Sequence, residues 1–449
     1  MLSIKEKTEI IISELNNKLI EREDIIPILL LTIFSKSHML LLGPPGVGKT
    51  YAIELISNFV ENLKYFEYLI TNKTTLEELF GTQVVDSDGS MIYNIEKSML
   101  DSHICFIDEL YKAPSNLINS LLGITHSSRS FYQRGRGKLK SPMISMFAAS
   151  NELPESDVVD AFDDRILFRF WVDEIRNIDN FKRFAKRDFD RTKTFSQHIN
   201  SEELLMIEEK SKEIFIHDDF VTLYADIRTK LSTEKVRISD RKLQSSLDIF
   251  QTSAYVNGRD YVDLSELFLL MDIAWKHFDD IDRVKRIIFN IIFGVPSNIK
   301  KVLKDNQDNY KMIISKLRSN TGKILDYSYN FYTSQAEDEF RKYVEEFKFL
   351  KEQVDIIYSN CESLKDNYLF AKKMEDMIAN NIFVKNYKNH IYNEVSENNS
   401  EVVDKNKVNK DHIFDLLSDV ELQSNKLNNW LINTPELYDY NNIKIEKGR

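Results

Sequence analysis

The stretch Gly43-Pro44-Pro45-Gly46-Val47-Gly48-Lys49-Thr50 decides the fold of this chain. It directly follows an apolar run at residues 38–42, which predicts a short buried strand. Glycine at the first and sixth positions, followed by lysine and threonine, is typical of a loop whose backbone N–H groups surround phosphates at the start of a helix. We expect Lys49 to neutralise the β- and γ-phosphates and Thr50 to ligate Mg²⁺. Tyr51, the next residue, completes the predicted nucleotide-binding segment.

A second apolar strand ends in two carboxylates, Asp108 and Glu109. Because ligands of open α/β sheets bind at the carboxyl ends of the strands, both acids are predicted to face the phosphate loop. We expect Asp108 to hold Mg²⁺ through water and Glu109 to orient and polarise the attacking water. A third apolar strand is followed by Asn151, which is placed to reach the γ-phosphate or that water. Asn at the end of a strand is also a common turn former, so both interpretations of Asn151 stay open.

Apolar strands alternate with amphipathic helices from residue 38 to residue 172. This pattern predicts an α/β core, a mainly parallel sheet covered by helices on both faces. Turn residues at 81–97 and 129–142 predict two hairpins. The predicted strands are 38–42, 64–70, 103–107, 143–149 and 167–171, and the predicted helices are 3–19, 24–34, one after Gly48, 75–80 and 114–124.

The chain beyond Gly137 has only four further glycines, so we expect the rest to be nearly all helical. We predict three parts: an α/β nucleotide-binding domain at 1–172, a helical lid at 173–290 and a C-terminal helical domain at 291–449. In the last part, apolar residues from Phe340 to Ala371 alternate steps of three and four, as in a heptad seam. A weaker seam at 413–430 follows a polar segment. Together they predict an antiparallel helical hairpin, with a parallel dimeric coiled coil as the alternative.

The composition limits the classes of function. The chain has 449 residues and a net charge of −11, which argues against a general nucleic-acid binder. Two cysteines give no disulfide framework, and the N-terminus lacks a signal pattern, so we expect a cytoplasmic protein. No apolar run is long enough to predict a membrane span. The eight scattered histidines show no metal-ligand spacing, so the metal we expect is the Mg²⁺ held by nucleotide phosphates.

Four segments of the sequence carry a resemblance to a known family. In order, they are Gly43 to Thr50, Phe106 to Ala113, Ala148 to Glu155 and Asp163 to Phe170. They resemble the MoxR group of AAA+ ATPases, and within it the RavA branch. The resemblance covers residues 1–290 and is strengthened by residues 66–71 and 239–242. It implies ATP and Mg²⁺ as ligands and ATP hydrolysis as the activity. It also implies that Asn151 is sensor 1, that Arg165 is the arginine finger that reaches a neighbouring subunit's nucleotide, and that Arg241 is sensor 2. Arg169 is the alternative finger.

The resemblance further implies a homo-oligomeric ring, a hexamer, because a finger that acts on a neighbour needs one. Family members of this kind remodel protein substrates beside a partner that carries a von Willebrand factor A (vWA) domain. The C-terminal third departs from the RavA branch, because it shows helical, Asn/Lys/Glu-rich sequence where that branch has a β-rich insertion. The insertion's partner, a lysine decarboxylase, is therefore not carried over.

Other interpretations stay open. The basic run Arg129, Arg134, Arg136, Lys138 and Lys140 in the second hairpin is either a solvated loop or the lining of a ring pore. A pore lining would suit a nucleic-acid translocase or helicase built on the same core. A third alternative is a scaffold whose oligomeric state is set by bound nucleotide. The arginines at 165 and 241 could also form structural ion pairs.

Overall fold

A computed structural model describes most of the first 293 residues and parts of the remainder. By contact the chain divides into two compact units, residues 1–292 with 375–390, and residues 293–374 with 391–449. Residues 375–390 thus group with the first unit, although we expected them in the C-terminal domain. The described residues are 2–85, 89, 91–125, 129–133, 137–153, 162–293, 309, 311–316, 319, 342, 345–346, 349–359, 373–387, 418 and 422.

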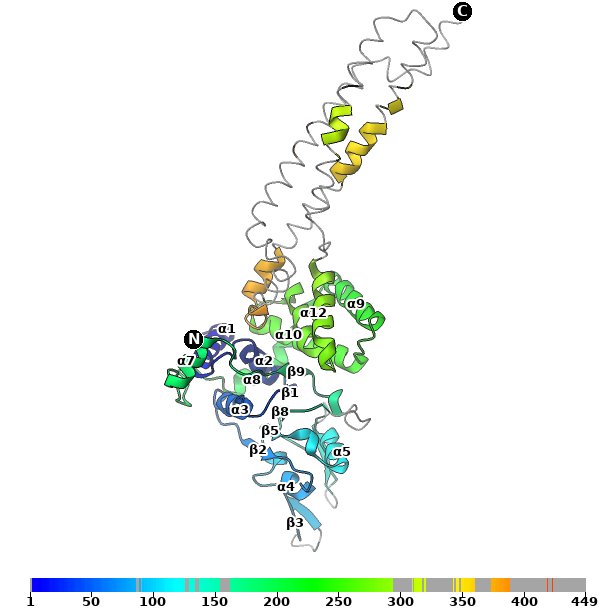
Figure 1. Ribbon diagram of the computed structural model, residues 1–449. Coiled ribbons are helices and arrows are strands. Elements are labelled where there is room, and N and C mark those ends of the chain that lie inside the picture. Colours follow the sequence, from blue (N-terminus) through cyan, green and yellow to red (C-terminus); the bar gives the residue numbers. More distant parts are fainter. Residues whose placement is uncertain are drawn as a thin grey trace, which may run out of the picture. The chain divides into compact units, whose positions relative to one another are not determined.

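The core of the first unit is a five-stranded sheet in which every pairing is parallel, in the order β2-β5-β8-β1-β9 (Figure 1). The sheet confirms the predicted α/β class. In its register Leu42 lies opposite Ser150 and Trp171, so β1 ends level with both neighbours. The strands are β1 Met39–Leu42, β2 Tyr65–Leu69, β5 Ile104–Asp108, β8 Ser145–Ser150 and β9 Phe168–Trp171.

Helices and two hairpins accompany the sheet. All residues of α2 are buried, which explains why its sequence is apolar except for Thr32. Both predicted hairpins are present and antiparallel, β3 with β4 and β6 with β7. The helices are α1 Ile4–Lys18, α2 Ile25–Phe34, α3 Lys49–Ser57, α4 Leu76–Phe80 and α5 Ser115–Ile124, with 3-10 turns η1 Met99–Asp101 and η2 Leu110–Lys112. The hairpin strands are β3 Thr82–Val85, β4 Met91–Asn94, β6 Ser130–Gln133 and β7 Gly137–Lys140.

A helical lid follows the sheet, as predicted. Its unpredicted feature is a pair of two-residue parallel strands, β10 and β11, which are too short to leave a periodic pattern. In the described part of the chain, no helix is both long and apolar enough to cross a membrane. The lid elements are α7 Ile178–Lys186, α8 Ser201–Ser211, β10 Phe215–Ile216, α9 Asp218–Thr233, α10 Asp240–Val256, β11 Tyr261–Val262, η3 Leu264–Leu269, α11 Leu270–Ile273 and α12 Phe278–Phe293.

Residues 375–387 return to the first unit and complete its core. Asn381 is 1% exposed and donates from Nδ2 to Glu266 Oε1 at 2.8 Å, while Asn257 Nδ2 donates to Asn381 Oδ1 at 3.0 Å. The ring of Phe383 packs edge-on against Phe34 of α2. This return segment therefore contacts both the lid and the α/β domain.

The second unit is described only in part. Leu350, Val354 and Ile357, three members of the predicted seam, are buried at spacings of four and three within a helical stretch at 349–359. This confirms the seam at those positions. Its other members lie outside the described residues, and so does almost all of the second seam at 413–430.

Candidate nucleotide site

The predicted phosphate loop connects β1 to α3, and its shape depends on glycine. Gly43 has φ +147°, and a Cβ there would lie 2.1 Å from the carbonyl oxygen of Val172. Gly46 and Gly48 have φ +82° and +85°, and a Cβ at either would meet nothing within 4 Å. The loop therefore has open space over its inner glycines. Gly48 caps α3 without a side chain, so N–H groups of the first turn are available to an anion.

Lys49 is held by the loop itself. Its Nζ donates to the carbonyl oxygens of Gly43 at 2.8 Å and Pro44 at 3.0 Å. Burial lowers the pKa of Lys49, and the negative charges of Asp108 and Glu109 oppose this shift. The loop lysine and the two acids therefore share one electrostatic site, as the sequence predicts.

Glu109 adopts a backbone conformation that is uncommon for a residue with a side chain. Its φ is +55°, in the left-handed region, which costs about 1–2 kcal/mol. Its Oε2 is buried and accepts no hydrogen bond of good geometry, although Lys112 Nζ lies 3.3 Å away. Asp108 Oδ1 accepts from the N–H of Glu109 at 2.9 Å. Strain and an unsatisfied carboxylate at one residue are typical of sites shaped by function.

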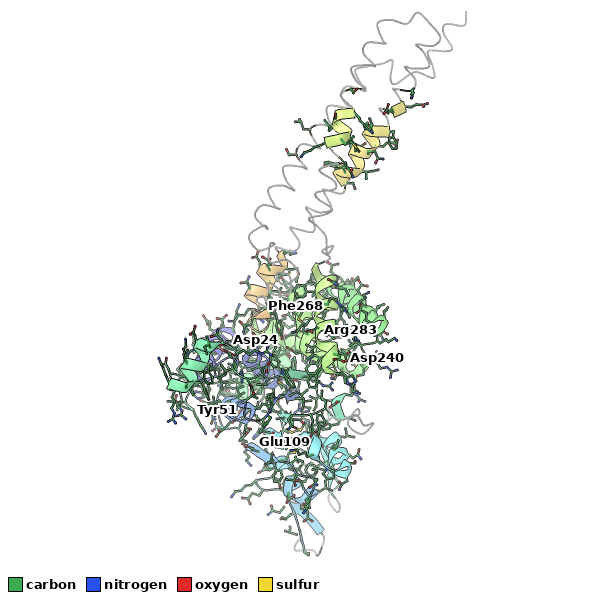
Figure 2. All side chains as sticks on the ribbon, in the orientation of Figure 1. Asp24, Tyr51, Glu109, Asp240, Phe268 and Arg283 are labelled. Carbon is green, nitrogen blue, oxygen red and sulfur yellow. The ribbon has the colours of Figure 1, made fainter. Side chains whose placement is uncertain are left out.

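A cavity of about 350 Å³ adjoins the loop. Tyr51, labelled in Figure 2, belongs to its wall, as do Val47 and Gly48. The rings of Phe184 and Phe189 stack with centroids 6.2 Å apart. Aromatic and apolar walls beside a phosphate loop suit a nucleotide base. The remaining lining residues are Lys18, Leu19, Ile20, Arg22, Ile175 and Arg191.

Sequence reasoning missed most of this cavity. Its walls come from the segment before α2 and from the region of α7, which lie far from the loop in sequence. Aromatic residues at helical spacing, such as those in α7, are typical of a core face, so they gave no signal for a ligand. Arg22 links the two walls, because its Nη2 donates to the carbonyl oxygens of Val47 at 2.8 Å and Asp173 at 2.9 Å.

Asn151 lies directly after β8, the strand between β1 and β5. The loop begins next to it, since the N–H of Gly43 donates to the carbonyl oxygen of Ser150 at 3.2 Å. The sheet therefore brings Asn151, the loop and Asp108 to the same edge. Its side chain is exposed there.

Arg165 and Arg241 come together in the same chain. Arg241 Nη1 lies 3.1 Å from Asp164 Oδ2, and its side chain is 55% exposed. Burial and the nearby charge of Arg241 both lower the pKa of Arg165. Neither arginine is among the residues that line the described cavity.

The structure does not favour Arg169, the alternative finger. Its side chain is 2% exposed and its Nη2 lies 3.1 Å from Asp163 Oδ2. Nη1 donates to the carbonyl oxygen of Trp275 at 3.1 Å. This guanidinium is therefore buried and paired within its own protomer, which argues against Arg169 as a finger for a neighbouring subunit.

The structure also differs from the prediction for Arg129. We expected it in a solvated or pore-lining run, but its guanidinium donates to the carbonyl oxygens of Met143, Ile144 and Lys36. Burial lowers its pKa to about 10. Arg129 therefore braces the end of the sheet. The two other arginines of that run lie outside the described residues.

A parallel sheet with a phosphate loop, strand-end acids and a helical lid defines the class of AAA+ P-loop ATPases. Residues 6–208 match the family model of the MoxR domain in the MoxR-vWA-beta-propeller ternary systems, and residues 219–288 match that of an AAA lid domain. The chain belongs to the MoxR-type AAA+ ATPases.

Known proteins resemble it over the same region. The uncharacterized protein MJ0079 of Methanocaldococcus jannaschii is 38% identical over 296 residues, which cover 65% of this chain and 76% of that protein. Chaperone MoxR1 of Mycobacterium tuberculosis is 24% identical over 283 residues, 59% of this chain and 74% of MoxR1. A crystal structure of a candidate ATPase from Cytophaga hutchinsonii shares the fold, with a TM-score of 0.52 at 17% identity over 65% of this chain and 95% of that one.

Proposed function

We propose that this chain hydrolyses ATP with Mg²⁺ in a ring of identical subunits and uses the reaction to remodel or assemble a partner protein. The observation that carries the proposal is the strained, unsatisfied Glu109 beside Lys49 and the glycine loop. Glu109 would orient and polarise the attacking water, and Asn151 would help to position it. Thr50 and Asp108 would hold Mg²⁺, which neutralises charge on the phosphates when bound.

Two arginines support action between subunits. Arg165 and Arg241 lie together around Asp164, and neither lines the cavity beside the loop of its own chain. We propose that Arg165 reaches the nucleotide of a neighbouring subunit, and that Arg241 acts as sensor 2 from the same place. A ring, as in the hexamers of related ATPases, would supply that neighbour.

The proposed partner is a protein with a vWA domain in the cytoplasm. Its support is the matched family model, whose description names MoxR-vWA-beta-propeller systems, and the relative described as a chaperone. Membership of the RavA branch stays a prediction. The translocase alternative has lost part of its support, because Arg129 is used inside the fold.

Turnover of purified protein with Mg²⁺-ATP tests the proposal. We expect Glu109→Gln to lower turnover about 100-fold or more while ATP still binds, since removal of a general base costs that much. Lys49→Ala, as the matched control, should lose ATP binding itself.

Two outcomes would contradict the proposal. If the wild-type protein shows no turnover, and Lys49→Ala abolishes assembly while Glu109→Gln leaves it intact, the chain is a nucleotide-binding scaffold. If DNA or RNA stimulates turnover severalfold, the nucleic-acid motor is favoured. A pull-down with Glu109→Gln protein and ATP would then identify the partner by mass.

A further inference from the structure

The turn that carries Arg165, residues 162–165, is tight. The N–H of Arg165 donates to the carbonyl oxygen of Phe162 at 2.9 Å, and the N–H of Ile166 donates to that of Asp163 at 3.2 Å. The direction of a side chain in this turn depends on what anchors its neighbours. Two consecutive aspartates in the turn, Asp163 and Asp164, provide the anchors, and they face different parts of the protein.

Asp163 anchors the turn inside the fold. Its side chain is 5% exposed, and its Oδ2 lies 3.1 Å from Arg169 Nη2 of β9. Lys242 of α10 is buried nearby, and its pKa is lowered by burial and by the charge of Arg169, against the opposing charge of Asp163. The carboxylate therefore balances buried cations and is fixed in place.

A further partner of Asp163 lies just after the acids Asp108 and Glu109. Tyr111 Oη donates to Asp163 Oδ1. Tyr111 lies in η2, which begins directly after Glu109, and the N–H of Lys112 closes that turn on the carbonyl oxygen of Glu109 at 2.9 Å. The 3-10 turn η2 thus joins the backbone of Glu109 to the hydroxyl that holds Asp163 (Glu109 is labelled in Figure 2).

Asp164 anchors the same turn to the lid. Its Oδ1 accepts from Ser239 Oγ and its Oδ2 from Arg241 Nη1. Ser239 is the N-cap of α10, the helix that also carries Lys242. The turn at 162–165 is therefore bonded on one side to the residues after Glu109 and on the other to the lid.

We propose that Tyr111 and Asp163 are positioning residues for Arg165. Through them, the η2 turn that follows Glu109 controls the arginine that the same subunit offers to its neighbour. The inference rests on the proposed function, in which Arg165 acts across subunits. It assigns Tyr111 a role at the neighbour's nucleotide, although in the sequence Tyr111 follows Asp108 and Glu109 of its own subunit.

Tyr111→Phe tests this, because it removes only the hydroxyl. We expect turnover to fall about 10-fold with ATP affinity unchanged, since a misplaced catalytic group slows the reaction without weakening binding. The matched control is Tyr65→Phe, which also removes one hydroxyl bonded to a carboxylate, that of Glu67 at 3.0 Å, at the start of β2. This control should keep wild-type turnover, and wild-type turnover in Tyr111→Phe would overturn the proposal.

Mixed assemblies separate action on a neighbour from action within one subunit. Tyr111→Phe mixed with Glu109→Gln should hydrolyse more ATP than the mean of the two proteins, because Glu109→Gln subunits supply a well-placed Arg165. A mixture of Tyr111→Phe with Arg165→Ala should give only the mean turnover of those two proteins. The reverse pattern would show that Tyr111 serves its own site and would overturn the inference.

A reference mixture tests the proposed function separately. Glu109→Gln with Arg165→Ala should exceed the mean of its components, since one protein supplies the arginine and the other an intact acid pair. If this mixture stays at the mean, Arg165 does not act across subunits, and the proposed function and the inference both fail. If it rises while the Tyr111→Phe mixtures do not follow the expected pattern, only the inference fails.

Discussion

The phosphate loop at 43–50 and the arginine turn at 162–165 both lie close in sequence to strands of the same sheet, β1 and β9, yet they are held in different ways. The loop is shaped by backbone: three glycines at positive φ, one of them against a carbonyl oxygen. The turn is held by charged and polar side chains from β9, η2 and the lid. A loop shaped by its backbone restricts which residues can occupy it, whereas a turn held by side chains depends on partners that lie elsewhere in the chain.

The largest effect is expected in the turn. Asp163→Ala would leave the Arg169 guanidinium buried without its carboxylate, which lowers the free energy of unfolding by about 3–5 kcal/mol. Urea unfolding of the purified protein measures the change. Asp164→Ala is the matched control: its partner Arg241 is 55% exposed, so we expect a loss below about 1 kcal/mol. Equal losses at the two aspartates would contradict this account of the turn.

The loop should respond to a single methyl group. Gly43→Ala places a Cβ against the Val172 carbonyl oxygen, so we expect a loss of about 2–3 kcal/mol and failure to bind ATP. Gly46→Ala meets no atom within 4 Å and carries only the backbone strain, about 1 kcal/mol. Thermal unfolding without nucleotide compares the two, and equal shifts in Tm would show that the close approach at Gly43 does not matter.

The smallest effect concerns His38, which joins both regions. It precedes β1, and its carbonyl oxygen accepts from the N–H groups of Leu167 and Phe168, which follow the turn. Its Nδ1 accepts from the N–H of Met146 at 3.0 Å, and burial, with a smaller effect of Arg129, lowers the pKa of His38 to about 3. The folded state therefore keeps this imidazole neutral where the unfolded chain protonates it.

The sign of the pH effect follows. Because the folded pKa lies below the unfolded value of 6.5, the stability from neutral His38 is present above pH 6.5 and is lost as pH falls toward 3. Between pH 7 and pH 5 this amounts to about 2 kcal/mol. We expect His38→Asn to lower stability at pH 7 but to lose less of it on acidification, as measured by urea unfolding at both values. A slope as steep as that of the wild type would contradict this.

The sequence predicted the loop, the acids and the five strands because each has a local cause. Glycines at fixed spacing follow from backbone geometry, and apolar runs that end in carboxylates mark strands at a binding edge. The surroundings of the arginines could not be predicted, because Asp163 pairs with Tyr111 and Asp164 with Arg241, both far away in sequence. Arg129 shows the same limit: a charge run predicts solvent, but three carbonyl oxygens at the sheet bind this member of the run.

The return of residues 375–387 to the first unit has a consequence for synthesis of the chain. When the lid leaves the ribosome, Glu266 and Asn257 still lack Asn381, the amide that joins them in the finished protein. Residues 293 to 381 must first be translated, which takes roughly 5–20 s at about 5–20 residues per second. These buried hydrogen bonds can therefore form only after a segment has been made that is translated well after α12, the last helix of the lid.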